Sequence, residues 1–190
     1  MREKGWRRYY WLDVQRLSQR LLKPHQELVA VRYFTSRVSA SLSDPHQAKR
    51  QGVYIEALQA LAGTTLHFGH YLTKTVKCFK CGAEWRTNEE KMTDVNIAIA
   101  LMEDAFTNAF DTALLISGDS DLVGPVVQVK KLYPNKRVVI AFPPERTSAR
   151  LRQEAHDSFV IGRKVLKESQ LSDEVRKPNG FVLKRPESWR

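Results

Sequence analysis

Segments with the hydrophobic pattern of a strand alternate with segments with the pattern of a helix along most of this 190-residue chain. A strand places successive side chains on opposite faces, whereas a helix repeats its apolar side every three to four residues. Such alternation is typical of β-α-β units, in which helices join parallel strands and cover the sheet. We therefore expect an α/β, Rossmann-like fold with a mainly parallel sheet and helices on both faces.

The limits of the segments follow from apolar spacing and from the residues that begin and end helices. Strands are expected over residues 27–38, 64–76, 112–117, 137–142 and 158–162. Helices are expected over residues 12–22, 44–63, 87–106, 121–133 and 147–155. Asp44 is the predicted N-cap of the helix 44–63, and Thr87 with Glu90 is the predicted capping box of the helix 87–106. From about Ser169 the chain is expected to be a polar tail with weak structure.

The charge of the chain points to a polyanionic partner. Lys and Arg number 31 against 21 Asp and Glu, which gives a formal net charge of +10 and a pI of about 9.8. A basic surface of this kind favours phosphate backbones. The sequence has no apolar run long enough to span a bilayer and no signal-peptide stretch at its start, so we expect a cytoplasmic protein without a membrane segment.

Two acids follow the apolar strand 112–117 in the sequence "LLISGDSDLVGP". Asp119 and Asp121 stand one residue apart, at the carboxyl end of a strand, where open parallel sheets bind their ligands. Two close carboxylates repel each other unless a cation lies between them, and acidic oxygen clusters suit Mg²⁺ or Mn²⁺. The alternative is that Asp119 caps the following helix and Asp121 faces water.

A third acid lies on the preceding helix. At 100° per residue, Asp94 falls on the same side as Leu101 and Ala105, which is the side expected to face the sheet. A carboxylate there is costly unless it is paired or binds a metal, so Asp94 is a candidate ligand. Asp104, at the edge of this apolar side, is a reserve ligand. The alternative for Asp94 is a salt bridge to a buried Arg or Lys.

The stretches "KMTDVNIAIALMEDAF" and "FDTALLISGDSDLVGP" resemble the NYN domain family, a bacterial branch of the PIN-like nuclease superfamily. The resemblance runs from about Gly5 to Ser169. It implies a metal-dependent ribonuclease that hydrolyses RNA phosphodiester bonds with Mg²⁺ or Mn²⁺. The residues that match the family pattern are Asp94, Asp119 and Asp121 as catalytic residues and metal ligands, with Ser117, Ser120 and Lys91 beside the substrate. The alternative is an RNA-binding protein that keeps the fold without cleaving.

The chain departs from the family pattern at its start. Family members usually open with a strand that ends in an acid and an Asn, in the form I-D-G-x-N-L. Here only four residues precede Gly5. We therefore expect residues 1–168 to form an N-terminally truncated NYN domain with a Cys-containing loop at 77–86, followed by a polar C-terminal tail at 169–190. A second departure is Ala100, where many relatives carry another acid.

The loop "CFKC" is a weak candidate for a zinc site. Cys78 and Cys81 supply two sulfur ligands, whereas a closed structural zinc site needs four ligands. His67 and His70 are close in sequence, but an odd spacing places them on opposite faces of a regular strand. The alternative is a reduced pair that tightens a turn at Gly82.

Basic and aromatic residues surround the same loop. The basic residues are Lys74, Lys77, Lys80, Arg86 and Lys91, and the aromatic ones are Phe79 and Trp85. Charges for phosphates beside rings for bases are what single-stranded RNA requires. The alternative is a solvated loop whose Trp85 packs inwards.

Overall fold

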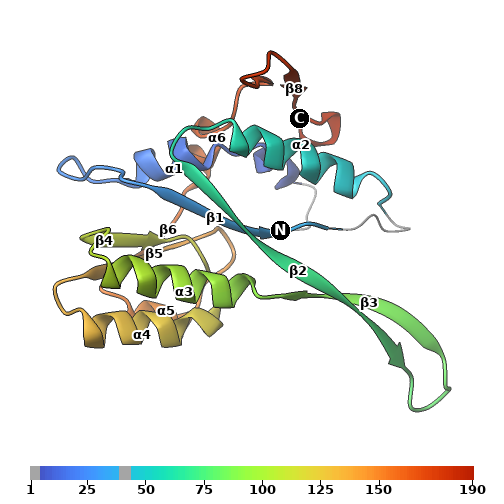
Figure 1. The fold of residues 1–190 in the computed structure, drawn as a ribbon, viewed down its shortest axis with the longest axis horizontal. Coiled ribbons are helices and arrows are strands. Elements are labelled where there is room, and N and C mark those ends of the chain that lie inside the picture. The colour runs from blue at the N-terminus through green and yellow to red at the C-terminus, as the bar shows by residue number, and fades with distance from the viewer. Residues whose placement is uncertain (1–4, 39–43) are drawn as a thin grey trace.

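The structure, a computed structural model, describes residues 5–38 and 44–190, except for the side chains of Thr73 and residues 86–90. Strands lie in a middle layer, with helices above and below it (Figure 1). The strands are β1 (Val31–Ser36), β2 (Thr64–Lys77), β3 (Glu84–Lys91), β4 (Thr112–Leu115), β5 (Arg137–Phe142), β6 (Asp157–Val160), β7 (Glu174–Arg176) and β8 (Val182–Lys184). The α-helices are α1 (Val14–Leu21), α2 (Gln47–Gln59), α3 (Thr93–Phe106), α4 (Val123–Leu132), α5 (Ala149–Glu154) and α6 (Arg163–Glu168). Short 3₁₀ helices are η1 (Arg7–Tyr9), η2 (Ser120–Leu122) and η3 (Glu187–Trp189).

The strands form small sheets where the alternation predicts one extensive sheet. β1 pairs with β2 in parallel, and β2 pairs with β3 antiparallel. β4, β5 and β6 form a second, all-parallel sheet. β7 and β8 form a separate antiparallel pair. The predicted α/β class, with parallel strands and helices on both faces, is confirmed, and a single parallel sheet is not formed by the described residues.

The second sheet is packed on both faces, because the side chains of β5 enter one core cluster on each side. Val138, Ile140 and Phe142 point to one side, where they pack with residues of α3, α4 and α5. Ala141 points to the other side and packs with α1 and α6. This alternation is the period of two that a strand imposes.

Two helices, α3 and α1, each pack against both of the larger sheets. α3 contacts β1 and β2, and its Leu101 and Ala105 are buried against the second sheet. α1 contacts β1, and its Leu17 packs in one cluster with Leu114 of β4. Among the described strands, β1 and β4 each have a hydrogen-bonded neighbour on one side only. β4 is half-buried along its length, whereas β5, which has neighbours on both sides, is mostly buried.

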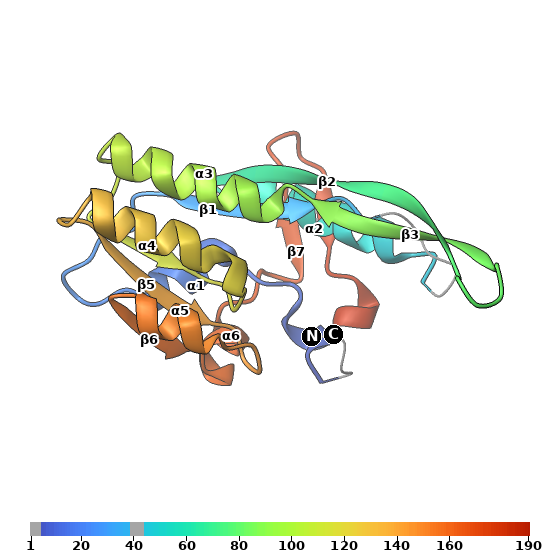
Figure 2. The ribbon, with the colours of Figure 1, turned by 90° about the horizontal axis from the view of Figure 1, so that it is seen from below.

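The β2–β3 hairpin extends well beyond the packed layers (Figures 1 and 2). Its register runs from His70 opposite Lys91 to Lys77 opposite Glu84. The helix predicted over 87–106 is therefore wrong at its start, because residues 87–91 pair with β2 and α3 begins at Thr93. Local sequence favours a capping box here, and pairing with a distant strand overrides it.

The helix predicted over 44–63 is shorter than expected, and its predicted cap is wrong. α2 begins at Gln47, with His46 at its N-cap. The Asp44 carboxylate instead forms an ion pair with Arg50, which holds the pKa of Asp44 below its ordinary value. Gly63 adopts a positive φ of 77° just before β2, as expected of a residue that ends a helical segment.

The C-terminal segment is packed, so the expectation of a weakly structured tail is wrong. Leu171, Leu183 and Trp189 are buried in one cluster with Trp11 and Tyr54. These three apolar residues are far apart in a polar sequence, so they do not show the periodic spacing of a helix or a strand. They are buried because they pack against the same surface of the folded protein.

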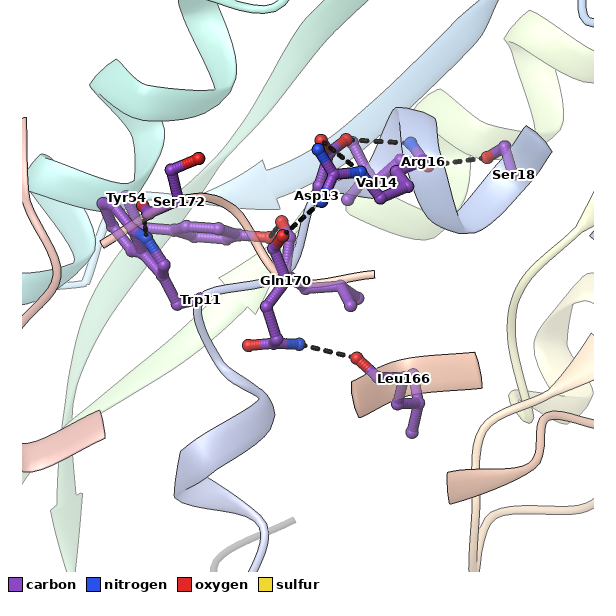
Figure 3. Close-up of polar contacts among 10 residues, drawn as sticks. Trp11, Asp13, Val14, Arg16, Ser18, Tyr54, Leu166, Gln170 and Ser172 are labelled. Carbon is purple, nitrogen blue, oxygen red and sulfur yellow. Dashed lines mark hydrogen bonds and ion pairs between the residues drawn. The ribbon is translucent and has the colours of Figure 1, made fainter. Parts of the chain in front are cut away.

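Polar contacts join the N-terminal segment to the C-terminal one and to α2 (Figure 3). The Trp11 indole Nε1 donates to the Ser172 carbonyl at 2.7 Å, and the Tyr54 hydroxyl donates to the Leu12 carbonyl at 2.8 Å. Burial raises the pKa of Tyr54 well above its ordinary value, which keeps its hydroxyl a donor. In the part of the chain that the structure describes, no helix is both long and apolar enough to cross a membrane.

Candidate acidic site

The acidic loop follows β4 directly, as the sequence predicts. Gly118 lies so close to the next loop that a Cβ on it would be 2.7 Å from the Arg146 carbonyl oxygen. Only glycine permits this approach of two backbones. The loops that follow β4 and β5 in the sequence are therefore in contact at the carboxyl ends of these strands.

The two acids of this loop have different surroundings. The Asp119 carboxylate accepts a hydrogen bond from the Asp121 N–H at 3.1 Å and caps η2. The Asp119 N–H in turn donates to the Ser117 hydroxyl at 3.1 Å. Asp121 and Ser120 are exposed. These contacts match the alternative in which Asp119 caps the following helix and Asp121 faces water, and the metal-binding role of the two carboxylates stays a prediction.

Asp94 lies in the first turn of α3 and is exposed. The expectation that it is buried against the sheet is wrong, since burial on α3 begins further along, at Ala100 and Leu101. Asp94 lies about one turn before Ile97 on α3, and α3 contacts η2 of the acidic loop. Ile97 packs against the cluster that contains Leu122, the residue after Asp121.

The start of α3 is held by groups that sequence patterns do not single out. The Thr93 and Ser36 hydroxyls lie 3.1 Å apart, and Ser36 is buried at the end of β1. A Cβ on Gly69 would lie within 2.6 Å of both hydroxyl oxygens and of the Lys91 carbonyl. Ser36 and Gly69 pair across the sheet, so the ends of β1 and β3 and the start of α3 meet at one point.

Asp104 is engaged by an arginine. The guanidinium of Arg32 on β1 holds both Asp104 carboxylate oxygens, one through Nε at 2.7 Å and the other through Nη2. This hydrogen bonding raises the pKa of Arg32. A carboxylate paired in this way is a poor reserve ligand, because a metal would have to replace the arginine.

The described residues contain no group of three His, Cys, Asp or Glu side chains placed to hold a metal ion. Asp94, Asp119 and Asp121 are thus not such a three-residue group in the described part of the chain. Asp94 lies on α3, which contacts η2, and Asp119 and Asp121 belong to η2 and its N-cap. Their catalytic and metal-binding roles stay predictions.

The cysteines lie at the tip of the β2–β3 hairpin. Cys78 and Cys81 are free thiols. The backbone N–H groups of Cys81 and Lys80 donate to the Cys78 sulfur and lower the pKa of that thiol. His67 and His70 lie back along β2 towards the body, so they are remote from the thiols.

The hairpin exposes aromatic rings beside basic side chains. Phe79 is fully exposed and Trp85 is half exposed, so the alternative of an inward-packed Trp85 is not what the structure describes. Lys74 and Lys80 are exposed on the same arm. Near the root, the Arg37 guanidinium lies 4.9 Å from the centre of the Phe68 ring.

These features define an α/β protein with an acidic loop at a strand end and a projecting basic arm. The family model described as NYN domain matches residues 3–163. The chain belongs to the NYN domain family, within the PIN-like nuclease superfamily, and the resemblance inferred from its motifs is confirmed.

Two known proteins are similar to the chain. A Pseudomonas putida protein named 6-hydroxy-3-succinoylpyridine 3-monooxygenase is 24% identical over 168 residues, which cover 71% of this chain and 53% of the relative. The chain thus spans about half the length of that relative. A crystal structure of a Vibrio parahaemolyticus protein of unknown function has a TM-score of 0.50 and 22% identity, covering 84% of this chain and 85% of that one. The second likeness concerns the fold alone.

Proposed function

We propose that the chain is a ribonuclease that hydrolyses RNA phosphodiester bonds at its acidic loop, with Mg²⁺ or Mn²⁺ as cofactor. The observation that carries the proposal is the position of Asp119 and Asp121, at the carboxyl end of a parallel strand in a chain of the NYN family. Open parallel sheets bind their ligands at that edge. Asp94, on the helix that packs beside the loop, is the third catalytic residue of the proposal.

The donor chemistry of the loop fits a magnesium-type cation. Mg²⁺ is commonly held by one or two carboxylates and completes its shell with water and substrate phosphates. Asp121 is exposed, and Asp119 uses one oxygen, Oδ1, for its cap. These two residues would hold the ion, with Asp94 completing the set. When bound, the ion lowers the pKa of a bound water and neutralises charge on the phosphate.

The remaining residues of the site would bind and orient RNA. Ser120 presents an exposed hydroxyl beside the acids, whereas the Ser117 hydroxyl orients the loop by accepting from Asp119. Lys91, at the root of the hairpin, would hold a flanking phosphate. A net charge of +10 supports attraction of the RNA backbone to the rest of the surface.

A second candidate is an RNA-binding protein that does not cleave. It is favoured by the absence of a three-ligand group among the described side chains, together with the exposed rings and lysines of the hairpin. The Pseudomonas relative is named as a monooxygenase, which is a different chemistry. Because the match covers 53% of that relative, the activity in its name is not proposed for this chain. The cytoplasmic location stays a prediction.

The test uses a labelled single-stranded RNA with Mn²⁺ and, separately, with chelator. Asp121→Asn should lower the cleavage rate by orders of magnitude, because it removes a ligand from the ion that activates water. It should leave RNA affinity unchanged or higher, since binding depends on Lys and Arg. Glu103→Gln is the matched control, because Glu103 is an exposed acid on α3, and this variant should cleave like the parent.

The same assay separates the two candidates. It should include a chain extended by a strand of the I-D-G-x-N-L type. Among the described strands, β1 and β4 each have a hydrogen-bonded neighbour on one side only, so each leaves an edge with which such a strand could pair. If both chains bind a broad set of RNAs and neither cleaves, the binding protein replaces the nuclease. Cleavage that persists in chelator and in Asp121→Asn would contradict the proposed site.

A further inference from the structure

The β2–β3 hairpin carries a pair of thiols to its tip, away from the rest of the chain (Figures 1 and 2). Cys78 follows the last residue of β2, and Cys81 lies in the turn before β3. Both thiols are free, and Cys81 is exposed. The acidic loop does not involve these residues, so their arrangement calls for its own explanation.

The turn at the tip holds the two sulfurs together. The Gly82 N–H donates to the Cys78 carbonyl at 2.9 Å, and the Cys78 N–H donates to the Ala83 carbonyl at 2.8 Å. Gly82 has a φ of 71°, which glycine adopts without strain. The backbone N–H groups of Lys80 and Cys81, and the Cys81 side chain, hydrogen-bond to the Cys78 sulfur. The turn thus presents two adjacent sulfurs, one of them already surrounded by donors, as thiolate ligands of a metal require.

One chain supplies only two such ligands. Structural zinc sites are tetrahedral and take four Cys or His ligands. The sequence contains two cysteines and five histidines, and all lie within the described residues. His70, the nearest histidine along the strand, is eight residues from Cys78, about 26 Å in an extended chain. No group of three metal-binding side chains occurs among the described residues.

We propose that the hairpin tips of two copies of this chain bind one zinc ion between them, through Cys78 and Cys81 of each copy. A second copy supplies the same pair of thiolates through a two-fold axis, so the two half-sites are complementary without any further residue. Four thiolates then complete the tetrahedral shell. The projection of the arm leaves both tips accessible to each other.

The other side chains of the tip suit this contact. Phe79 has a relative exposure of 105%, and a facing tip would remove part of this ring from water. Four thiolates on one Zn²⁺ carry a net charge of about −2. The exposed Lys80 of each tip would offset that charge, whereas Lys77 already pairs with Glu84 at 3.4 Å. The negative charge of the zinc–thiolate group in turn counteracts the repulsion between two chains of formal charge +10.

The contact depends on the metal. Two hairpin tips bury far less surface than a stable protein interface requires, so side-chain packing alone would not hold the dimer. Zinc–thiolate bonds supply enough free energy to do so, as in small zinc-dependent folds. The dimer should therefore form and dissociate with zinc, whether or not the chain cleaves RNA.

The experiment measures zinc content and molar mass of the full chain purified without chelator and with a reductant. We expect one zinc for every two chains and a mass by light scattering of twice the 21.9 kDa chain. Chelator, or the double variant Cys78→Ser and Cys81→Ser, should give a zinc-free monomer. The melting temperature of the chelated chain should equal that of the zinc-bound chain. Replacing zinc by Co²⁺ should give a charge-transfer band of the intensity expected for four sulfur ligands per metal.

A glycine pair provides the matched control. Gly82→Ala keeps both thiols and meets no atom within 4 Å, so it strains only the turn backbone, and zinc affinity should fall about tenfold or more. Gly180→Ala, at a φ of 86° in equally open space in the β7–β8 turn, should leave zinc affinity unchanged. One zinc per chain on a monomer, no zinc at all, or a dimer that survives the cysteine variant would each overturn the proposal.

Discussion

At the scale of the residue, carboxylates that look alike in the sequence have different tasks. Asp104 is held by the Arg32 guanidinium, and Asp44 by Arg50, so both are structural ion pairs. Asp119 caps η2, and Asp121 is exposed beside it. Asp104 and Asp44 thus have arginine partners 72 and 6 residues away in the sequence, and these partners make them less available to a ligand.

His156 should make stability depend on pH. Its Nδ1 accepts the Val138 N–H at 3.0 Å, and burial, with the nearby Lys130 and Arg137, lowers its pKa from the ordinary value. The unfolded chain therefore binds more protons than the folded one below about pH 6.5, so the free energy of unfolding should fall as pH drops through that range. His156→Asn keeps an acceptor for Val138 and should show a smaller decrease.

Urea unfolding between about pH 7 and pH 5 checks this prediction, because the ordinary pKa of a histidine in an unfolded chain, about 6.5, lies in that range. The control is His25→Asn, because His25 is exposed and its replacement should leave the pH profile of the parent. Equal profiles for His156→Asn and the parent would show that His156 does not couple folding to protons.

At the scale of the element, β2 takes part in two pairings. Residues Thr64 to Gly69 pair with β1, and residues His70 to Lys77 pair with β3. The change of partner falls at Gly69, where the end of β1 and the start of α3 crowd the backbone. The projecting hairpin is thus anchored to the body at one crowded point.

Two glycine substitutions should act in opposite directions. Gly69→Ala puts a Cβ within 2.6 Å of the Lys91 carbonyl and should lower the free energy of unfolding by about 1–3 kcal/mol. Gly52→Ala, inside α2 with no atom within 4 Å, should raise it by about 0.5–1 kcal/mol through helix propensity. Urea denaturation measures both. A neutral Gly69→Ala would mean that the hairpin root can shift at little cost.

At the scale of the whole molecule, the two ends of the chain form one cluster. Trp189 packs against Tyr10, Trp11 and Tyr54, with ring centres about 6 Å apart. An isolated antiparallel bridge also joins Leu12 to Gln170. The first sheet and α2 therefore depend for their burial on the last residues of the chain.

Truncating the terminal tryptophan should be costly. Trp189 is 9% exposed, and Trp189→Ala should lower the free energy of unfolding by about 3 kcal/mol or more, because it leaves a cavity among three aromatic rings. Phe181→Ala is the control, since Phe181 is 60% exposed and should cost less than about 1 kcal/mol. Urea denaturation compares the two, and equal losses would mean that the C-terminal cluster contributes little to folding.

Local patterns in the sequence were sufficient for the second sheet and for the acidic loop. The strands at 112–117 and 137–142 appear as β4 and β5, and Asp119 and Asp121 lie at the strand end where the motif places them. The NYN family also follows from these motifs. These features depend on neighbours within a few residues, because the period of a strand and the chemistry of a turn are local properties.

Tertiary structure decided the features that depend on distant partners. Residues 87–91 became β3 because β2 offers them a ladder, and the C-terminal segment is ordered because Trp11 and Tyr54 bury Trp189. Asp104 is a poor candidate ligand because its carboxylate binds Arg32, which lies 72 residues earlier in the sequence. No local period encodes such pairings, since their free energy comes from groups that meet only after the chain has folded.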